Sequence, residues 1–160
     1  MSLHLDRVLL VEDDPSIVGM FVANWPDWGW VLAANFLEAI QNIQRDSNNY
    51  DLIILDLKVP ERDGSPDYTE GFNTLKRIHQ ASAAPIALCT GNDTEEYEKR
   101  ADEFGVYGII QKGSWVKHRI EQVIEGAIAK WKVHRYETAT NILREERQRW
   151  RTGFLGNEKH

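Results

Sequence analysis

Short, uninterrupted apolar segments alternate with amphipathic segments along the first 130 residues of the chain. Apolar runs of roughly 4–8 residues that end at polar or turn residues are typical of strands buried on both faces of a sheet. Such runs predict strands at residues 8–11, 30–33, 51–56, 85–89 and 108–111. The intervening segments carry apolar residues at helical spacing and predict helices at residues 15–25, 36–43, 71–80 and 95–104, followed by a long helix from near residue 115.

The alternation of strand and helix predicts an α/β fold: a doubly wound, five-stranded parallel sheet with helices on both faces and an extended C-terminal helix. Right-handed crossovers place the C-terminal ends of all parallel strands at one edge of the sheet. Ligands of open α/β sheets bind in the crevice at that edge. The residues that directly follow each strand are therefore the first candidates for a functional site.

Acidic residues follow two of the predicted strands. Glu12 and Asp13 come directly after the first strand, and Asp56 ends the third. Three crowded carboxylates repel one another unless one of them binds a proton or a cation lies between them. Mg²⁺ prefers oxygen ligands and is commonly held by carboxylates together with phosphate oxygens and waters. This arrangement therefore predicts a magnesium site.

Two further polar residues complete the set, with Thr90 after the fourth strand and Lys112 after the fifth. A hydroxyl and an ammonium group can both bind the oxygens of a phosphoryl group as negative charge spreads over them. Asp56 would then be the nucleophile and form an aspartyl phosphate. Each residue taken singly has a simpler explanation as a turn, a cap or a solvated charge. The hypothesis depends on their occurrence together at the ends of successive strands.

Four segments carry a family resemblance, and they read VLLVEDDP (8–15), DLIILDLKVP (51–60), ALCTG (87–91) and IIQK (109–112). With these segments the chain resembles the response-regulator receiver domains of two-component signalling over residues 7–129. The resemblance implies a flavodoxin-like fold, as in chemotaxis regulators, with strand order 2-1-3-4-5. We accordingly expect a receiver domain at residues 1–130 and a helical extension or linker at residues 131–160.

The resemblance also implies roles for individual residues. Glu12, Asp13, Asp56 and the carbonyl group of Lys58 are expected to hold Mg²⁺. Asp56 is expected to accept a phosphoryl group from a histidine kinase or phosphotransfer protein, while the threonine and lysine described above contact that group and the small Gly91 leaves room for it. The expected function is a signalling switch and not an enzyme with separate substrates, although receivers phosphorylate and dephosphorylate themselves.

Three features depart from the usual family pattern. Gly113 stands where a proline usually follows the lysine, which predicts a more flexible loop. Ile109 stands where the family usually has an aromatic switch residue, and Tyr107 is a candidate substitute if the strand extends to include it. The loop at residues 61–71 is about seven residues longer than usual, which is consistent with a tolerated surface insertion or with a lid or partner-specificity element beside the phosphorylation site.

Other functions fit the sequence less well. An aspartate-nucleophile phosphatase generally has a second aspartate two residues after the nucleophile, and Lys58 stands there. A non-phosphorylated, receiver-like scaffold is a further alternative, but the complete set of site residues argues against it. A nucleotide- or flavin-binding module is disfavoured because the loop after the first strand is acidic, whereas a phosphate cradle needs glycines and free amides.

The charge is unevenly distributed along the chain. Residues 1–129 carry 11 basic and 21 acidic residues, a net charge of −10, whereas residues 130–160 carry 8 basic and 4 acidic residues, a net charge of +4. An acidic body repels nucleic-acid phosphates, so we expect no direct nucleic-acid binding. No apolar run approaches the ~20 residues needed to cross a bilayer. With no signal-peptide pattern and one cysteine, Cys89, we expect no membrane association and a cytoplasmic location.

A second, weaker apolar stripe runs through the C-terminal segment among charged residues. It consists of Val133, Tyr136, Thr140, Leu143 and Trp150. The segment could pair with a second copy in a homodimer, lead to an output domain outside this sequence, or fold back on its own receiver. About 30 residues are too few for most DNA-reading domains.

Overall fold

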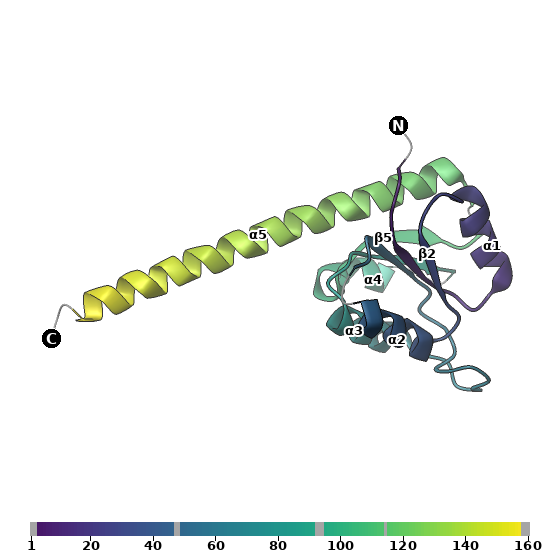
Figure 1. The fold of residues 1–160 in the computed structure, drawn as a ribbon, viewed down its shortest axis with the longest axis horizontal. Coiled ribbons are helices and arrows are strands. Elements are labelled where there is room, and N and C mark those ends of the chain that lie inside the picture. The colour runs from purple at the N-terminus through teal and green to yellow at the C-terminus, as the bar shows by residue number, and fades with distance from the viewer. Residues whose placement is uncertain (1–2, 47–48, 92–94, 114, 158–160) are drawn as a thin grey trace. The chain divides into compact units, whose positions relative to one another are not determined.

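The computed structural model describes residues 3–46, 49–91, 95–113 and 115–157. A parallel sheet has the strand order β2-β1-β3-β4-β5 (Figure 1). Its strands are β1 (Val8–Val11), β2 (Trp30–Ala33), β3 (Leu52–Leu55), β4 (Ile86–Thr90) and β5 (Val106–Gln111). The predicted α/β class, the five strands and their order are confirmed.

Three of the helices lie close to their predicted ranges, namely α1 (Pro15–Asn24), α2 (Phe36–Asp46) and α3 (Gly71–Ala81). The start of α1 shows how the local sequence specifies the boundary. The carboxylate of Asp14 accepts a hydrogen bond of 2.9 Å from the backbone N–H of Ser16, and Pro15 occupies the first turn, where no backbone donor is needed.

The single helix predicted at residues 95–104 is wrong. A short helix, α4 (Glu95–Lys99), is followed by a 3₁₀ turn, η1 (Ala101–Phe104). Gly105 then adopts a φ of +67°, and β5 begins at Val106, earlier than predicted. The tighter turn places the ring of Phe104 in the core, 5.6 Å from the ring of Phe72 on α3.

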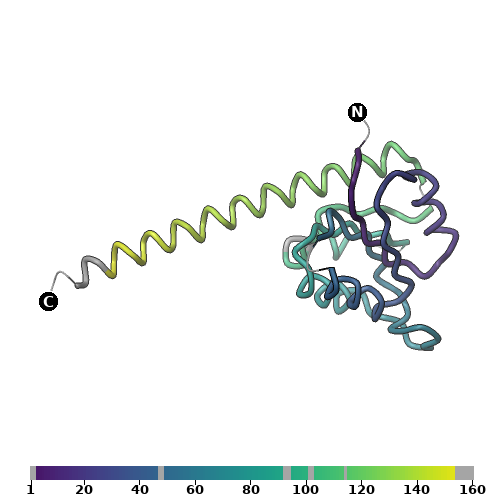
Figure 2. Tube along the Cα trace, in the orientation of Figure 1, coloured from purple at the N-terminus to yellow at the C-terminus, as the bar shows by residue number. Residues whose placement is uncertain are grey.

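Hydrophobic side chains cover both faces of the sheet, and the alternation along β1 shows the division. Val8 and Leu10 pack with residues of α1 and of the first turns of α5 (Lys117–Asn157). Leu9 and Val11 pack with residues of α2 and α3. These two helices lie side by side on their face of the sheet (Figure 2). The strands are thus buried on both faces, as their continuous apolar runs predicted.

An aromatic cluster fastens α1 to the beginning of α5. The ring of Phe21 lies 6.0–6.1 Å from the rings of Trp25, Trp30 and Trp115. The indole N–H of Trp25 donates a hydrogen bond of 2.8 Å to Oε1 of Glu121 on α5. This indole therefore has a partner for its only polar group within an apolar cluster.

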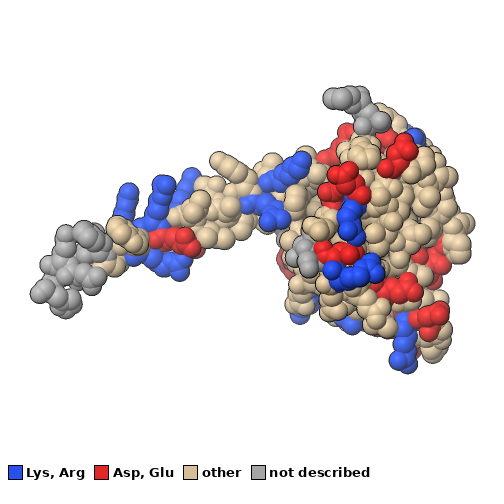
Figure 3. All heavy atoms as spheres, in the orientation of Figure 1, with Lys and Arg blue, Asp and Glu red and all other residues tan. Residues whose placement is uncertain are grey.

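The chain forms two compact units, Met1–Ile128 and Ala129–His160. Helix α5 begins in the first unit, where Ile120 and Ile124 are buried, and continues into the second. Among the described helices, none is both long and apolar enough to span a membrane. Figure 3 shows acidic side chains on the visible surface of the first unit and lysine and arginine side chains along the helix of the second.

Candidate phosphorylation and metal site

The register of the central strands brings the first two candidate carboxylates to the same level of the sheet. Val11 of β1 pairs with Leu55 of β3, so Glu12 and Asp56 are the next residues at the C-terminal edge. The backbone N–H of Asp56 donates to the carbonyl of Val11 at 3.0 Å, which continues the ladder by one residue. The side chains of Glu12 and Asp56 are both buried. Two carboxylates are therefore held beside each other away from water.

Lys112 joins these carboxylates. Its Nζ donates a hydrogen bond of 2.9 Å to Oδ2 of Asp56 and lies 3.1 Å from Oε2 of Glu12. It also donates a longer hydrogen bond of 3.5 Å to Oε1 of Glu12. Burial lowers the pKa of Lys112, but the hydrogen bond and charge of Asp56, together with those of Glu12, outweigh this effect and raise it. The lysine is therefore a fixed cation in the site.

Asp13 completes a cluster of three acidic groups. One carboxylate oxygen from each of Glu12, Asp13 and Asp56 lies within 4.8 Å of the others, a spacing that could hold a metal ion. Burial raises the pKa of Glu12 to about 7, and the negative charge of Asp56 adds to the effect. The N–H of Asp14 and the ammonium group of Lys112 oppose the shift without cancelling it. The cluster thus carries more negative charge than its surroundings stabilise.

The donor set fits a hard divalent cation. Oε2 of Glu12 is buried and accepts no hydrogen bond from the described residues, although it forms the ion pair with Lys112. Such an oxygen is available as a ligand, and three carboxylates form the kind of site that Mg²⁺ or Ca²⁺ prefers. The backbone N–H of Lys58 donates to Oδ1 of Asp56 at 3.2 Å, so this loop is adjacent to the cluster. Metal binding by the Lys58 carbonyl stays a prediction.

Thr90 lies at the end of β4, beside the lysine. Its carbonyl accepts a hydrogen bond of 2.9 Å from the backbone N–H of Lys112, and the residue is buried. A side chain added at Gly91 would meet Lys112 only at an ordinary contact distance of 3.7 Å. The structure therefore brings Thr90 to the same edge as the acidic cluster, and steric hindrance near Lys112 does not by itself require glycine at position 91.

Two of the departures from the family pattern can be examined in β5 and the loop after it. Gly113 adopts a φ of +91°, which proline cannot adopt, so glycine suits this backbone. β5 includes Tyr107 as well as Ile109, but its pairing with β4 is irregular between Val106 and Gly108, so simple alternation does not assign Tyr107 to a face of the sheet. Ile109 packs against the same core cluster as Val106, three residues earlier, which reflects this break in the alternation. The strand does extend to include Tyr107, and the substitution of Tyr107 for an aromatic switch residue stays a prediction.

The long loop after β3 is an ordered hairpin, which the sequence did not reveal. Pro60 and Tyr68 form an antiparallel bridge, and the backbone N–H of Thr69 donates to the carbonyl of Val59 at 2.8 Å. The buried hydroxyl of Thr69 donates to the carbonyl of Leu57 at 3.1 Å and accepts from the N–H of Val59 at 3.2 Å. The hairpin is therefore anchored one residue beyond Asp56.

A turn signal in the sequence could have indicated this hairpin. Asp63-Gly64 lies at its tip, and Gly64 adopts a φ of +72°, as glycine commonly does in tight turns. The carbonyl groups of Pro60 and Glu61 also accept hydrogen bonds of 2.9 Å from the first N–H groups of α2. The segment thus supplies partners for a helix N-terminus, which distinguishes it from an unstructured insertion.

The fold, the strand order and the acidic edge define a receiver domain. The model of the response regulator receiver domain family matches residues 8–125, and the chain belongs to this family. It is accordingly the receiver domain of a two-component response regulator system.

Several relatives are similar to about two thirds of the chain. Transcription factor SKN7 of Chaetomium thermophilum is 42% identical over 109 residues, which are 66% of this chain and 13% of that protein. The transcriptional regulatory protein YclJ of Bacillus subtilis is 30% identical over 108 residues, which are 66% of this chain and 44% of YclJ. The chain thus spans less than half the length of these relatives.

Solved structures agree on the fold. A CheY-like receiver domain protein of Methanospirillum hungatei superposes with a TM-score of 0.63 at 20% identity, over 81% of this chain and 98% of that one. NtrX of Brucella abortus gives a TM-score of 0.65 at 21% identity, over 85% of this chain and 30% of NtrX. At these identities the likeness supports the fold alone.

Proposed function

We propose that Asp56 accepts a phosphoryl group from a histidine kinase or a phosphotransfer protein, in a reaction that depends on Mg²⁺. The observation that carries this proposal is the position of Lys112, whose ammonium group contacts both Asp56 and Glu12 at the edge where three carboxylates converge. Phosphoryl transfer to a carboxylate requires a nucleophile, a fixed cation and an acidic cluster able to hold a metal ion.

The residues of the chain have separate tasks in the transfer. A carboxylate oxygen of Asp56 forms a bond to phosphorus as the bond between phosphorus and the donor nitrogen breaks, and the donor histidine leaves with its electron pair. Lys112 and the hydroxyl of Thr90 stabilise the charge on the transferred oxygens. Glu12, Asp13, Asp56 and the Lys58 carbonyl would hold Mg²⁺, which supplies positive charge to the phosphoryl oxygens and relieves repulsion among the carboxylates.

The outcome in this proposal is a switch in partner binding and not turnover of a separate substrate. Lys58 lies two residues after Asp56, where a phosphatase of this type would have an acid/base carboxylate, so hydrolysis of external esters is disfavoured. The net charge of −10 over residues 1–129 supports a receiver that does not itself bind nucleic acid. A cytoplasmic location is part of the proposal, supported by the single, buried Cys89.

The test is the covalent state of the whole chain after incubation with Mg²⁺ and acetyl phosphate, measured by intact-protein mass spectrometry. We expect the wild type to gain one phosphoryl group, and Asp56→Asn to gain none. Asp63→Asn, a change at the exposed hairpin tip, is the matched control and should gain it as the wild type does. Omission of Mg²⁺ with EDTA should abolish the gain. A wild type without phosphoryl uptake, or a phosphorylated Asp56→Asn variant, would contradict the proposal.

A further inference from the structure

Apolar residues in the second unit recur at intervals that alternate between three and four residues. This spacing averages 3.5 residues and is typical of the seam of a left-handed coiled coil, in which positions a and d of each heptad face the partner helix. In this register position a is occupied by Val133, Thr140 and Arg147, and position d by Ala129, Tyr136, Leu143 and Trp150. All of these residues belong to the continuous helix α5.

The large apolar members of this seam are exposed to solvent. Exposure is 57% for Val133, 75% for Tyr136, 59% for Leu143 and 73% for Trp150. An apolar stripe along one side of a helix is ordinarily buried against another element. Over the described residues 129–153 the stripe therefore forms a surface suited to another helix.

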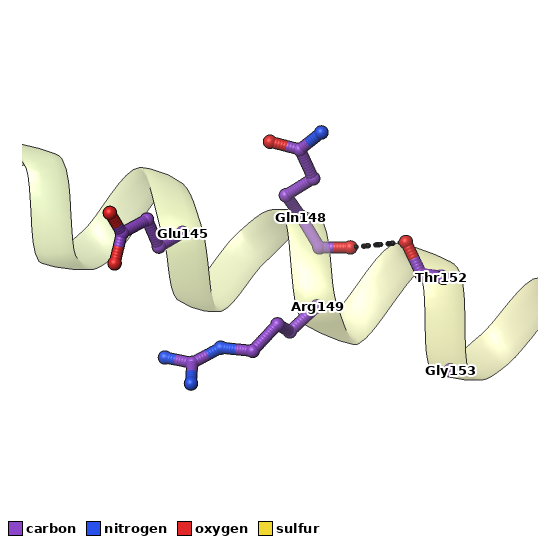
Figure 4. Close-up of a pocket in the computed structure, with 5 residues that line it drawn as sticks. All are labelled: Glu145, Gln148, Arg149, Thr152 and Gly153. Carbon is purple, nitrogen blue, oxygen red and sulfur yellow. Dashed lines mark hydrogen bonds between the residues drawn. The ribbon is translucent and has the colours of Figure 1, made fainter.

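Positions on the opposite side of the helix are mainly polar. Figure 4 shows four of them in the last described turns, Glu145, Gln148, Arg149 and Thr152. Together with Gly153 they line a shallow pocket, in which the hydroxyl of Thr152 donates a hydrogen bond of 2.9 Å to the carbonyl of Gln148. Among the described residues, only residues of α5 line this pocket, and four of the five are at positions b, c and f, which face solvent in a coiled coil.

The charged residues beside the seam are complementary to those of a second copy of the chain. In a parallel coiled coil, a residue at position g lies next to position e of the following heptad in the other helix. Lys132 at g then meets Glu137 at e of a second copy, and Glu146 at g meets Arg151 at e. Twofold symmetry forms each of these pairs twice. The intervening pair, Ala139 with Arg144, contains a single charge, so none of these flanking pairs places like charges together. Within the seam itself, Arg147 at position a adjoins Arg147 of the second copy, and this like-charge contact opposes the pairing.

We propose that residues 129–153 bind the same segment of a second copy of this chain as a parallel, in-register, two-stranded coiled coil. Thr140 and Arg147 occupy seam positions that favour apolar residues, and polar residues there lower stability while they fix the register. The pairing is therefore weak and depends on protein concentration. It stands independently of phosphorylation at Asp56, because it rests on the exposed seam and its flanking charges.

Neighbouring residues of similar size and exposure allow a matched test of association. Leu143 lies on the seam, whereas Ile142, at 50% exposure, lies at the outward position c. Sedimentation equilibrium of the full chain should show a monomer–dimer equilibrium. Leu143→Glu should raise the dissociation constant at least about tenfold, and Ile142→Glu less than about twofold. A wild type that is monomeric at every concentration would overturn the proposal; this result is expected if the helix binds its own receiver or a different protein. Equal effects of the two variants on the dissociation constant would also overturn it.

Cysteine cross-linking tests the direction of the pairing. Tyr136→Cys and Trp150→Cys, made singly, should each form a disulfide with the same residue of the second copy under mild oxidation, because equal d positions adjoin in a parallel register. Ile142→Cys is the control and should cross-link slowly; the native Cys89, which is buried in the wild-type chain, is present in all three variants. In an antiparallel pair at most one of the two d positions can meet its own copy. Cross-linking at only one of them, or equally fast at position 142, would overturn the proposal.

A charge exchange tests the flanking pairs. Glu146→Arg should weaken association by placing like charges together, and the double variant Glu146→Arg/Arg151→Glu should restore it. A double variant that associates no better than Glu146→Arg would show that these two residues do not meet across the interface, and would overturn the parallel register.

Discussion

Replacement of Glu12 by glutamine tests whether the acidic cluster lowers the stability of the metal-free protein. The side chain of Glu12 is buried, and its pKa is raised from an ordinary value of 4.5 to about 7. A carboxylic acid with a raised pKa binds its proton more tightly in the folded chain than in the unfolded chain. The contribution of Glu12 to stability is therefore fully present below pH 4.5 and is lost as the pH rises through about 7.

The magnitude follows from the difference between the two pKa values. At about 1.4 kcal/mol for each pH unit, a rise from 4.5 to about 7 corresponds to about 3 kcal/mol of lost stability above pH 8. Glutamine has nearly the same shape and stays neutral, and its side-chain oxygen can still accept the hydrogen bond from the N–H of Asp14. In the absence of metal we therefore expect Glu12→Gln to be more stable than the wild type at pH 8, by about 1–3 kcal/mol.

Urea unfolding, followed by tryptophan fluorescence in EDTA between pH 5 and pH 8, measures this difference. The gap between Glu12→Gln and the wild type should widen as the pH rises, and saturating Mg²⁺ should stabilise the wild type more than the variant. Glu125→Gln, at an exposed position on α5, should follow the wild type. An equal pH dependence for Glu12→Gln and the wild type, or a less stable variant at pH 8 without metal, would refute the electrostatic argument.

Three further predictions concern packing. A Cβ at Gly29 would clash with the main-chain carbonyl oxygen of Asp6, so Gly29→Ala should cost about 3 kcal/mol or more in urea unfolding. Gly19→Ala, in open space on α1, should instead stabilise the protein by about 0.5–1 kcal/mol, and similar effects of the two changes would contradict this. Thr69→Val should cost about 1–3 kcal/mol and speed amide hydrogen exchange in the hairpin, and unchanged exchange would show that the hydroxyl does not anchor it. Gly71→Ala should displace the ring of Tyr97, whose hydroxyl would clash with the added Cβ, and unshifted NMR signals of that ring would exclude the contact.

The strands and the site could be predicted from the sequence because both depend on local signals. Each strand is a continuous apolar run, and parallel pairing brings the residues that follow these runs to one edge. Asp56 and Lys112 are 56 residues apart, yet each is identified by its position after its own strand. The parallel topology then brings Asp56 and Lys112 close together, so their proximity could be inferred without knowledge of the side-chain contacts across the sheet.

The features that the sequence did not reveal depend on contacts between distant residues. The 3₁₀ turn before β5 accompanies the packing of Phe104 on Phe72, which the helical pattern of residues 95–104 does not encode. The hairpin after β3 depends on the hydroxyl of Thr69 and on carbonyl groups that also receive the N-terminus of α2. Such hydrogen bonds follow no periodic pattern, so a polar stretch with one turn signal is consistent with either a loose loop or an anchored hairpin.

The charge conflict at the edge of the sheet connects stability with the proposed switch. Burial, and to a smaller extent repulsion by Asp56, raise the pKa of Glu12, and Lys112 only partly offsets these effects. A site with unsatisfied charge gains free energy from any ligand that supplies the missing positive charge. In the proposed switch, phosphorylation would add negative charge at Asp56 and strengthen the attraction for Lys112, whose backbone N–H donates to the carbonyl of Thr90 at the ends of β4 and β5. A change in charge at Asp56 would therefore act on the ends of β4 and β5 through the side chain of Lys112 alone. This coupling does not require an aromatic residue at position 109.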